Sequence, residues 1–423
     1  MLSKDFLAQL SRHIALAKME YDASAGNKPF GGVNVILCGD IYQFPPVEVS
    51  KTGAIYHTSN NTAEEATGQG IYRQFRTVVM LKQQVRVGKP EWRNFLESLC
   101  RGHVQEKHIK LLKDRVLTNP MCVNTKFDAE PWLNSYLITP RHSVRTRWNE
   151  AAVAHHCQKT GQQLYLCPAY NTCAGNGGRR PIALHEQYAA ARGSKHSQNN
   201  GRLREKGGLS DVVPLAINMK VMVTLNVETD LDIANGARGT ITGIALDPNE
   251  PAFENPLAPV VTLSRLPAYI LVKLDRTRAA PVAGLGEGVI PLIPASKSYY
   301  ISLSVVQEDG KTKEVRQCVN RLQFPITPAY AFTNYRSQGQ MIPAAIVDIA
   351  TPPSGNGLNL ANLYAALSRC TGKDNIQILQ DFDESMFSKS WDYELVKENK
   401  RLERLDKETE DKYTTWEGRI SKT

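Results

Sequence analysis

The chain has 423 residues, of which 42% are hydrophobic and 22% are charged. This length and apolar content allow roughly two to four domains and exclude wholesale disorder. The 51 Lys and Arg residues exceed the 42 Asp and Glu residues, and the resulting net charge of +9 favours a polyanionic partner only weakly.

Several signals for export, membrane insertion and metal binding are missing. No stretch approaches the ~18–20 apolar residues of a spanning helix, and the N-terminus has Lys4 and Asp5 where a signal peptide needs an apolar core. The eight cysteines form no C-x-x-C pair and no cluster with zinc spacing. We therefore expect reduced thiols, no metal site and no membrane partner in an intracellular protein, nuclear or cytoplasmic.

The first part of the chain predicts alternating helices and strands. Apolar residues at helical spacing predict a helix over residues 1–22 with Ser3 as its N-cap. The apolar run 33–40 predicts a strand buried on both faces, which ends at Gly39-Asp40, and residues 77–81 predict another strand. A helical pattern covers residues 91–117. Residues 135–140 predict a strand, and a helix through Val144, Trp148 and Val153 follows it.

The pattern changes after residue 160. Residues 168–210 are rich in Gly, Asn, Arg and Ser, which predicts a long flexible insertion. Residues 212–322 predict an all-β barrel or sandwich, with a turn at Asn235-Gly236. The α/β pattern returns with strands at 344–350 and 375–379 and a helix at 360–369. A charged helix with a thin leucine stripe follows from Trp391.

Five segments carry motifs in a fixed order. They are Gly39-Asp40-Ile41-Tyr42-Gln43-Phe44-Pro45-Pro46-Val47, the arginine Arg86 after Leu81-Lys82-Gln83-Gln84-Val85, Thr139-Pro140-Arg141, Thr333-Asn334-Tyr335-Arg336-Ser337-Gln338-Gly339, and Tyr364-Ala365-Ala366-Leu367-Ser368-Arg369. A further pair, Ile217–Met222 and Asn235–Gly239, lies in the β-rich region. In order and spacing, the chain resembles the Pif/RecD-like DNA helicases of superfamily one, especially their transposon-type (Helitron-like) branch.

The resemblance implies an α/β fold, the P-loop NTPase (RecA-like) helicase architecture. It assigns residues 1–80 to a partial first RecA-like domain, 81–165 and 325–390 to a second, 166–324 to an insertion with an SH3-like β-domain, and 391–423 to a charged helix or tail. It also implies ATP-dependent 5′–3′ unwinding, with ATP and Mg²⁺ as cofactors, single-stranded or junction DNA as partner, and roles in repair and recombination.

The same resemblance carries functional roles to individual residues. It implies that Gln43, Arg86 and Arg369 are catalytic, because an amide can sense a terminal phosphate and guanidinium groups stabilise its equatorial oxygens. It implies nucleotide contacts for Gly39, Asp40, Gln43, Arg86, Gly339 and Arg369. The residues implied to contact nucleic acid are Pro46, Thr139, Arg141, Thr333, Arg336, Ser337 and Gln338.

Two elements of such an enzyme are not in this sequence. No G-x-x-x-x-G-K-[ST] phosphate-binding loop occurs, and we interpret Gly310-Lys311-Thr312 as a hairpin turn because Val305 stands where the leading glycine is needed. The acidic pair that binds Mg²⁺ in the family would precede Met1. The resemblance thus leaves the first RecA-like domain without its phosphate-binding strand and its magnesium-binding strand. Because those strands would cover the apolar segment 33–40, we expect this segment to expose an apolar patch or an open sheet edge.

The leading hypothesis is a helicase truncated at its N-terminus, inactive toward ATP as it stands, which is either a remnant or the product of an incomplete gene model. The alternatives are an ATP-independent nucleic-acid-binding or regulatory remnant, one half of a split helicase whose second chain supplies the missing motifs, and an unrelated α/β metabolic enzyme.

Overall fold

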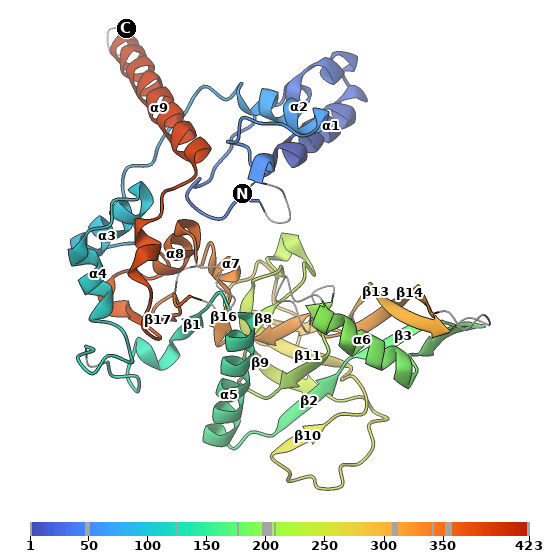
Figure 1. Cartoon of the computed structure of the whole chain (residues 1–423). Coiled ribbons are helices and arrows are strands. Elements are labelled where there is room, and N and C mark those ends of the chain that lie inside the picture. The colour runs from blue at the N-terminus through green and yellow to red at the C-terminus, as the bar shows by residue number, and fades with distance from the viewer. Residues whose placement is uncertain are drawn as a thin grey trace. The chain divides into compact units, whose positions relative to one another are not determined.

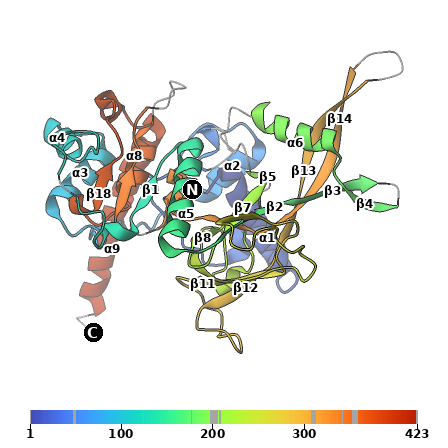
Figure 2. The same ribbon diagram turned by 90° about the horizontal axis from the view of Figure 1, so that it is seen from below.

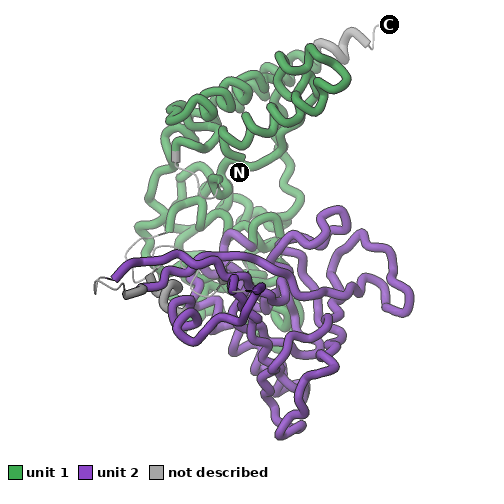
Figure 3. Tube along the Cα trace, turned by 90° about the vertical axis from the view of Figure 1, so that its right-hand side faces the viewer, with its two compact units in different colours: residues 1–135, 337–423 green, residues 136–336 purple. Residues whose placement is uncertain are grey.

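The computed structural model describes residues 2–46, 51–123, 125–175, 177–196, 205–206, 209–306, 312–340, 342–351 and 358–420. The chain forms two compact units, Met1–Ser135 with Ser337–Thr423 (unit 1) and Tyr136–Arg336 (unit 2), which Figure 3 distinguishes by colour. Unit 2 is thus inserted into unit 1 along the sequence. The finer division into four domains stays a prediction.

Unit 1 is mainly helical. Its helices are α1 (Lys4–Met19), α2 (Ala63–Tyr72), α3 (Pro90–Arg101), α4 (Glu106–Lys113), α8 (Leu360–Leu367) and α9 (Tyr393–Ile420), and its strands are β17 (Ala345–Val347) and β18 (Ile376–Ile378) (Figure 1). The short helix α7 (Asn334–Ser337) crosses the boundary between the units.

Helix α1 begins where the sequence predicts. The Ser3 side chain accepts a hydrogen bond from the Phe6 amide at 3.2 Å, which satisfies one of the free N–H groups of the first turn. The buried face of α1 contributes Leu7 to a core with Phe30, Ile55 and Ile71. This core fixes α1 against α2.

The strands predicted at 33–40 and 77–81 are wrong, because neither segment forms a strand in the structure. Ile36, Val79 and Leu81 are 87%, 73% and 94% exposed. An apolar run becomes a buried strand only when neighbouring strands cover it, and the described residues supply no such neighbours. The predicted exposure of apolar side chains near residues 33–40 is confirmed.

The single helix predicted over 91–117 is two helices. Gly102 adopts a left-handed conformation with φ 68° and ends α3, and the His103 amide donates to the Ser98 carbonyl at 2.8 Å. Helix α3 buries Trp92, Phe95 and Leu99, and it packs against α8.

The strands predicted at 344–350 and 375–379 are confirmed as the shorter β17 and β18. They pair in parallel, with Ala345 opposite Ile376 and Val347 opposite Ile378, and both are buried. The helix predicted at 360–369 is confirmed as α8, which the Asn359 side chain caps by accepting from the Asn362 amide at 2.8 Å. This arrangement delivers the chain to Ser368 and Arg369 at the end of α8.

In its described residues, unit 2 contains two parallel strand pairs beside its antiparallel ladders. One is β1 (Tyr136–Ile138) with β16 (Ala331–Phe332), and α5 (His142–Thr160) follows β1; the other is β10 (Val260–Thr262) with β2 (Leu164–Pro168). A five-stranded sheet has the order β12-β11-β9-β8-β15, made of Val289–Leu292, Tyr269–Leu274, Arg238–Ala245, Lys220–Val223 and Ile326–Pro328. A three-stranded sheet has the order β10-β2-β7, made of Val260–Thr262, Leu164–Pro168 and Val212–Leu215.

The two sheets and α5 share one core. It contains Val153 and Cys157 from α5, Cys167 and Leu215 from the smaller sheet, and a larger set from the five-stranded sheet, including Val221, Val223, Ile241, Ile270, Val272, Ile290 and Ile326. The β-rich character predicted for residues 212–322 is confirmed.

The flexible insertion predicted at 168–210 is wrong for much of that range. A four-stranded sheet of order β13-β14-β3-β4 contains β3 (Tyr170–Gly175) and β4 (Gly178–Pro181) beside β13 (Ala295–Val306) and β14 (Thr312–Gln323), and α6 (Leu184–His196) packs on β13 (Figure 2). A small ladder joins β5 (Glu205–Lys206) and β6 (Leu209–Ser210). Residues 197–204, 207 and 208 lie outside the described part.

The ladder of β13 and β14 extends to Val306 opposite Thr312, which is the pairing expected of a hairpin. Gly310 and Lys311, where we predict the turn itself, lie outside the described residues. Among the residues that the structure describes, no helix has the length and apolarity needed to cross a membrane.

Candidate nucleotide and nucleic-acid sites

The turn that holds Asp40 and Gln43 is fixed by its own hydrogen bonds. The Asp40 carboxylate accepts from the Tyr42 amide at 2.9 Å and from Gln43 Nε2 at 3.2 Å. Phe44 anchors the turn at 2% exposure, whereas the ideal Cβ position at Gly39 has no atom within 4 Å. Gln43 is half-buried, and its amide nitrogen is held by Asp40. Pro46 is half-buried, and Val47, the last residue of this motif, lies outside the described residues.

The Gln43 side chain also contacts Gln338, which belongs to the motif at residues 333–339. Gln338 Nε2 donates to Gln43 Oε1 at 2.8 Å, although 295 residues separate the two in sequence. Ser337, next to Gln338, is fully buried, and Gly339 has φ +78° with no atom near its ideal Cβ position. The structure therefore brings Ser337, Gln338 and Gly339 to the turn that carries Gln43.

Arg369 is a buried cation at the end of α8. It is 1% exposed, its Nη1 donates to the Ser337 carbonyl at 3.3 Å, and its Nη2 donates to Ser368 Oγ at 2.6 Å. Its Nε is buried and has no hydrogen-bond partner among the described residues. Burial, followed by repulsion from the charge of Arg86, lowers the pKa of Arg369 to about 10. Arg369 therefore keeps its charge at neutral pH.

Arg86 shares a partner with Arg369. Arg86 Nη1 donates to the Ser368 carbonyl at 3.3 Å, and Asp40 is close enough to Arg369 to oppose part of the lowering of its pKa. Two guanidinium groups held near each other repel, and an anion bound between them would relieve that repulsion. The three residues implied to be catalytic, Gln43, Arg86 and Arg369, thus lie in one connected network.

Sequence reasoning placed Tyr364 and Ser368 in a motif without giving them a role, and it did not single out Cys100. Ser368 accepts from both arginines, through its carbonyl and its hydroxyl. Tyr364 hydrogen-bonds Cys100 on α3, and burial raises the pKa of both groups, to about 12 for Cys100. Ser368 could have been found from its place beside Arg369. The Cys100 contact joins residues 264 positions apart and leaves no signal in the sequence.

The ends of two parallel strands bring together the nucleic-acid candidates of unit 2. Thr139 follows β1 and Thr333 follows β16, and these strands pair through Ile138 and Phe332. Thr139 Oγ1 accepts from the Arg141 amide at 3.2 Å, and Thr333 Oγ1 accepts from the Arg336 amide at 3.4 Å. Both hydroxyl groups thus shape the backbone that carries an arginine. Pro46, Ser337 and Gln338, the other implied contacts, belong to unit 1.

Two cationic side chains, from β8 and β9, lie close to an aromatic ring of β1. The Tyr136 ring, at the start of β1, has Lys220 Nζ at 5.3 Å and the Arg238 guanidinium carbon at 5.6 Å from its centroid. Burial raises the pKa of Tyr136. Neither Tyr136 nor Arg238 was expected to take part in a site.

The charged groups fit a phosphate better than a metal. A buried arginine with an unpaired Nε, a second arginine and an amide are donors that suit the terminal phosphate of a nucleotide. Within the described ranges, no group of three or more His, Cys, Asp or Glu residues is placed to hold a metal ion.

Comparison with curated proteins finds two distant relatives. The chain is 22% identical over 375 residues to ATP-dependent DNA helicase PIF6 of Trypanosoma brucei brucei, covering 85% of this chain and 38% of the relative. It is 23% identical over 388 residues to ATP-dependent DNA helicase PIF7 of the same organism, covering 90% and 34%. The chain therefore spans little more than a third of the length of these relatives. No family model matches it.

Solved structures share the fold. Bacteroides Pif1 bound to single-stranded DNA superposes with a TM-score of 0.55 at 19% identity, covering 95% of this chain and 72% of that one. Pif1 helicase from Candida albicans gives 0.51 at 18% identity, covering 94% and 75%. The α/β fold is thus the RecA-like architecture of P-loop NTPases, as expected. In sequence the chain is thus distantly similar to two curated ATP-dependent DNA helicases, and in fold it is similar to solved Pif1 helicases.

Proposed function

We propose that this chain is part of an ATP-dependent DNA helicase that moves 5′–3′ along single-stranded or junction DNA. The observation that carries the proposal is the network of Gln43, Arg86 and Arg369, with the buried Nε of Arg369 unpaired. In this proposal the two arginines bind the γ-phosphate of ATP, and Gln43 reports its presence to Gln338. The order and spacing of the five motifs support the finer assignment to the transposon-type, Helitron-like branch.

Gln43 and Gln338 give the proposal its mechanical element. Gln43 lies in the turn that would face the nucleotide, and Gln338 lies in the segment implied to follow the DNA. A change in the hydrogen bonding of Gln43 when a phosphate arrives would shift its 2.8 Å contact with Gln338. In this proposal ATP supplies the free energy for the shift, Gln43 senses the phosphate, and Gln338 transmits the change. We assign no residue of this chain to Mg²⁺.

The purified chain, with single-stranded DNA present, is expected to release phosphate from ATP at the background rate. Its sequence holds no G-x-x-x-x-G-K-[ST] loop, and positioning and metal binding supply nearly all catalysis of phosphoryl transfer. A phosphate-release assay, with a complete Pif1-family helicase as positive control, measures this. DNA-stimulated turnover by the chain alone would contradict the expectation.

DNA binding tests the proposal directly. The Arg141→Ala and Arg336→Ala variants are each expected to weaken binding of oligonucleotides of any sequence and to reduce the slope of log affinity against log salt by about 1, because each loses one phosphate contact. Fluorescence anisotropy at several salt concentrations measures both quantities.

The matched control for these two variants is Arg276→Ala. The Arg276 side chain is 80% exposed, lies in the same unit, and pairs with Asp232 at 3.5 Å. Its salt slope should equal that of the unaltered chain. Salt slopes for Arg141→Ala and Arg336→Ala that match this control would contradict the proposed DNA path.

A second candidate is a helicase assembled from two chains, with the missing motifs supplied in trans. The exposed apolar side chains of Val33, Ile36 and Leu37 favour it, because such a run is suited to burial between strands. Recovery of DNA-stimulated ATP hydrolysis on adding a separate chain that contains the phosphate-binding loop would support this candidate.

A further inference from the structure

The sheet of β13, β14, β3 and β4, here called the arm, has one covered face and one open face. Residues directly opposite each other in an antiparallel ladder lie on the same face. Tyr299, Ile301 and Val319 belong to the covered face, where Ala189 and Ala190 of α6 pack against them. Figures 1 and 2 show α6 alongside the long β13–β14 ribbon.

Helix α6 is held firmly on the covered face. The Glu186 carboxylate is 1% exposed and accepts from Arg180 at 2.6 and 2.7 Å and from Gln317 Nε2 at 2.7 Å. The ion pair with Arg180 lowers the pKa of Glu186 to about 2 despite burial. The arm is therefore a braced sheet, and its other face is presented on a fixed support.

The open face carries aromatic, guanidinium and hydroxyl groups. Tyr300 is 62% exposed and Tyr170 is 50% exposed. The Arg316 guanidinium lies 5.0 Å from the centre of the Tyr300 ring, so the two planar groups form one stacked surface. The register adds hydroxyl and amide groups to the same face, at Ser296, Ser298, Ser302, Thr172 and Asn320.

The charge of the open face is weakly basic. The register places Arg316 and Arg179 on it with one acidic residue, Glu314, whereas Arg180 and Arg321 lie on the covered face and pair with Glu186 and Asp211. Exposed aromatic rings next to guanidinium groups on a sheet stack unpaired bases, while basic groups hold the phosphates. Bases inside a duplex do not offer their faces for such stacking.

We propose that the open face of the arm is a second binding surface for single-stranded DNA, with Tyr300 and Arg316 as its stacking platform. The ladder spacing places Tyr170 about 13 Å along the strands and about 10 Å across them from Tyr300, so one strand of DNA can cross both rings. The proposal rests on the proposed DNA-binding function for the identity of the polyanion, but it uses none of the residues of the DNA path proposed above.

The test is a titration of the full chain with labelled oligothymidylate, followed by fluorescence anisotropy. The Tyr300→Ala variant is expected to bind about five-fold or more weakly, because stacking of one base is worth about 1–3 kcal/mol. The matched control is Tyr188→Ala, which removes a tyrosine on α6 that is 67% exposed. This variant should change the affinity by less than about two-fold.

Two further variants locate the interaction. Tyr300→Trp keeps a stacking ring, so its affinity should match that of the unaltered chain and its added indole fluorescence should be quenched by the oligonucleotide. Arg316→Lys keeps the charge and loses the planar group, so it should weaken binding while leaving the salt slope unchanged.

The outcomes separate this inference from the proposed function. If the unaltered chain binds with strong salt dependence and Tyr300→Ala behaves like Tyr188→Ala, the arm surface is refuted and the DNA path through Arg141 and Arg336 stands. If the chain binds neither oligothymidylate nor a forked DNA junction, both are refuted, whereas binding of the junction alone refutes only the arm surface. Tighter binding of a duplex than of the single strand overturns the assignment of the arm to single-stranded DNA.

Discussion

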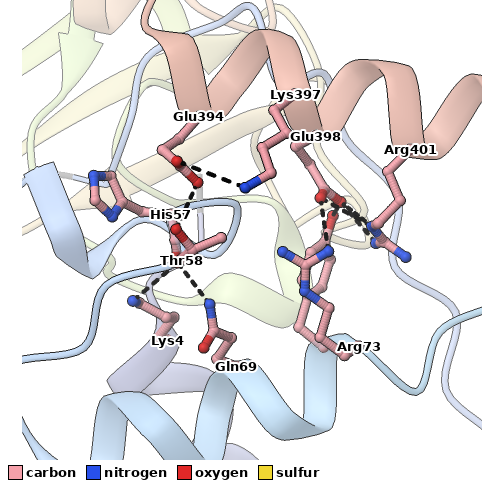
Figure 4. Close-up of polar contacts among 10 residues, drawn as sticks. Lys4, His57, Thr58, Gln69, Arg73, Glu394, Lys397, Glu398 and Arg401 are labelled. Atoms are coloured by element: carbon pink, nitrogen blue, oxygen red, sulfur yellow. Dashed lines mark hydrogen bonds and ion pairs between the residues drawn. The ribbon is translucent and has the colours of Figure 1, made fainter.

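Replacing Glu398 by alanine is expected to cost unit 1 about 3–5 kcal/mol of unfolding free energy, the effect of breaking a buried ion pair by removing one partner. The Glu398 carboxylate on α9 is 2% exposed. It accepts from the Tyr72 hydroxyl at 2.8 Å, from Arg73 at 3.2 Å and from Arg401 at 2.7 Å. Figure 4 shows Arg73 and Arg401 converging on Glu398.

The loss is large because Glu398 serves several partners at once. Without it, the Arg401 side chain, 16% exposed, loses its counter-ion, and the buried Tyr72 hydroxyl loses its acceptor. Burial, reinforced by the charge of Glu398, raises the pKa of Tyr72, so the hydroxyl stays protonated and keeps its need for an acceptor. Glu398→Gln retains an acceptor for Tyr72 and is expected to lose less.

Urea denaturation followed by circular dichroism measures the effect, with Glu408→Ala as control. Glu408 lies on the same helix and pairs with Arg404 at 2.9 Å, but both side chains are well exposed, so its removal should cost at most about 0.5 kcal/mol. Equal losses for Glu398→Ala and Glu408→Ala would show that the network adds nothing to the packing of α9.

The tail helix shows how far sequence reasoning reached. The charged pattern and leucine stripe predicted α9 correctly, and Leu395 and Leu405 are buried. The pattern could not reveal which segment of the chain α9 contacts. Thr409 and Asp406 accept from the amides of Val78 and Met80 at 3.1 and 2.8 Å, so α9 side chains bind the backbone of a segment for which we predicted a strand. Contacts across more than 300 residues leave no local periodicity.

Whether an element depends on nearby or on distant residues also separates the correct predictions from the wrong ones. The Ser3 cap and the caps and apolar faces around α8 depend on residues a few positions apart, and they were predictable. Strand β3 depends on pairing with β14, about 150 residues away, and its polar composition concealed it. For the candidate site, the motifs identified Gln43, Arg86 and Arg369 from the sequence. The contacts that both arginines make with Ser368, and the unpaired Nε of Arg369, could be recognised only in the structure.

Gly68→Ala is expected to destabilise unit 1 by about 3 kcal/mol or more, because α1 and α2 approach each other too closely there for any side chain. An ideal Cβ at Gly68 would lie 2.0 Å from the Lys4 carbonyl oxygen and 2.6 Å from its carbonyl carbon. Backbone atoms cannot move aside as the end of a flexible side chain can. One helix must therefore shift, which would disturb the core of Leu7, Phe30 and Ile71.

Lys4 itself resists that shift. Its side chain is fully buried, and its Nζ donates to the carbonyls of His57 and Ser59 at 3.2 and 2.6 Å and to Asn60 Oδ1 at 2.8 Å. Figure 4 shows Lys4 and Gln69 converging on His57, whose carbonyl also accepts from Gln69 Nε2 at 2.9 Å. Moving α1 away from α2 would break these hydrogen bonds as well.

Gly70→Ala, two residues further along α2, should have the opposite sign. No atom lies within 4 Å of its ideal Cβ position, and alanine is favoured over glycine inside a helix by up to about 1 kcal/mol. Thermal denaturation should therefore rank the midpoints as Gly70→Ala, then the unaltered chain, then Gly68→Ala. Equal midpoints for the two variants would mean that α1 and α2 do not pack through Gly68, whereas the expected order can arise only if that contact is as close as the structure has it.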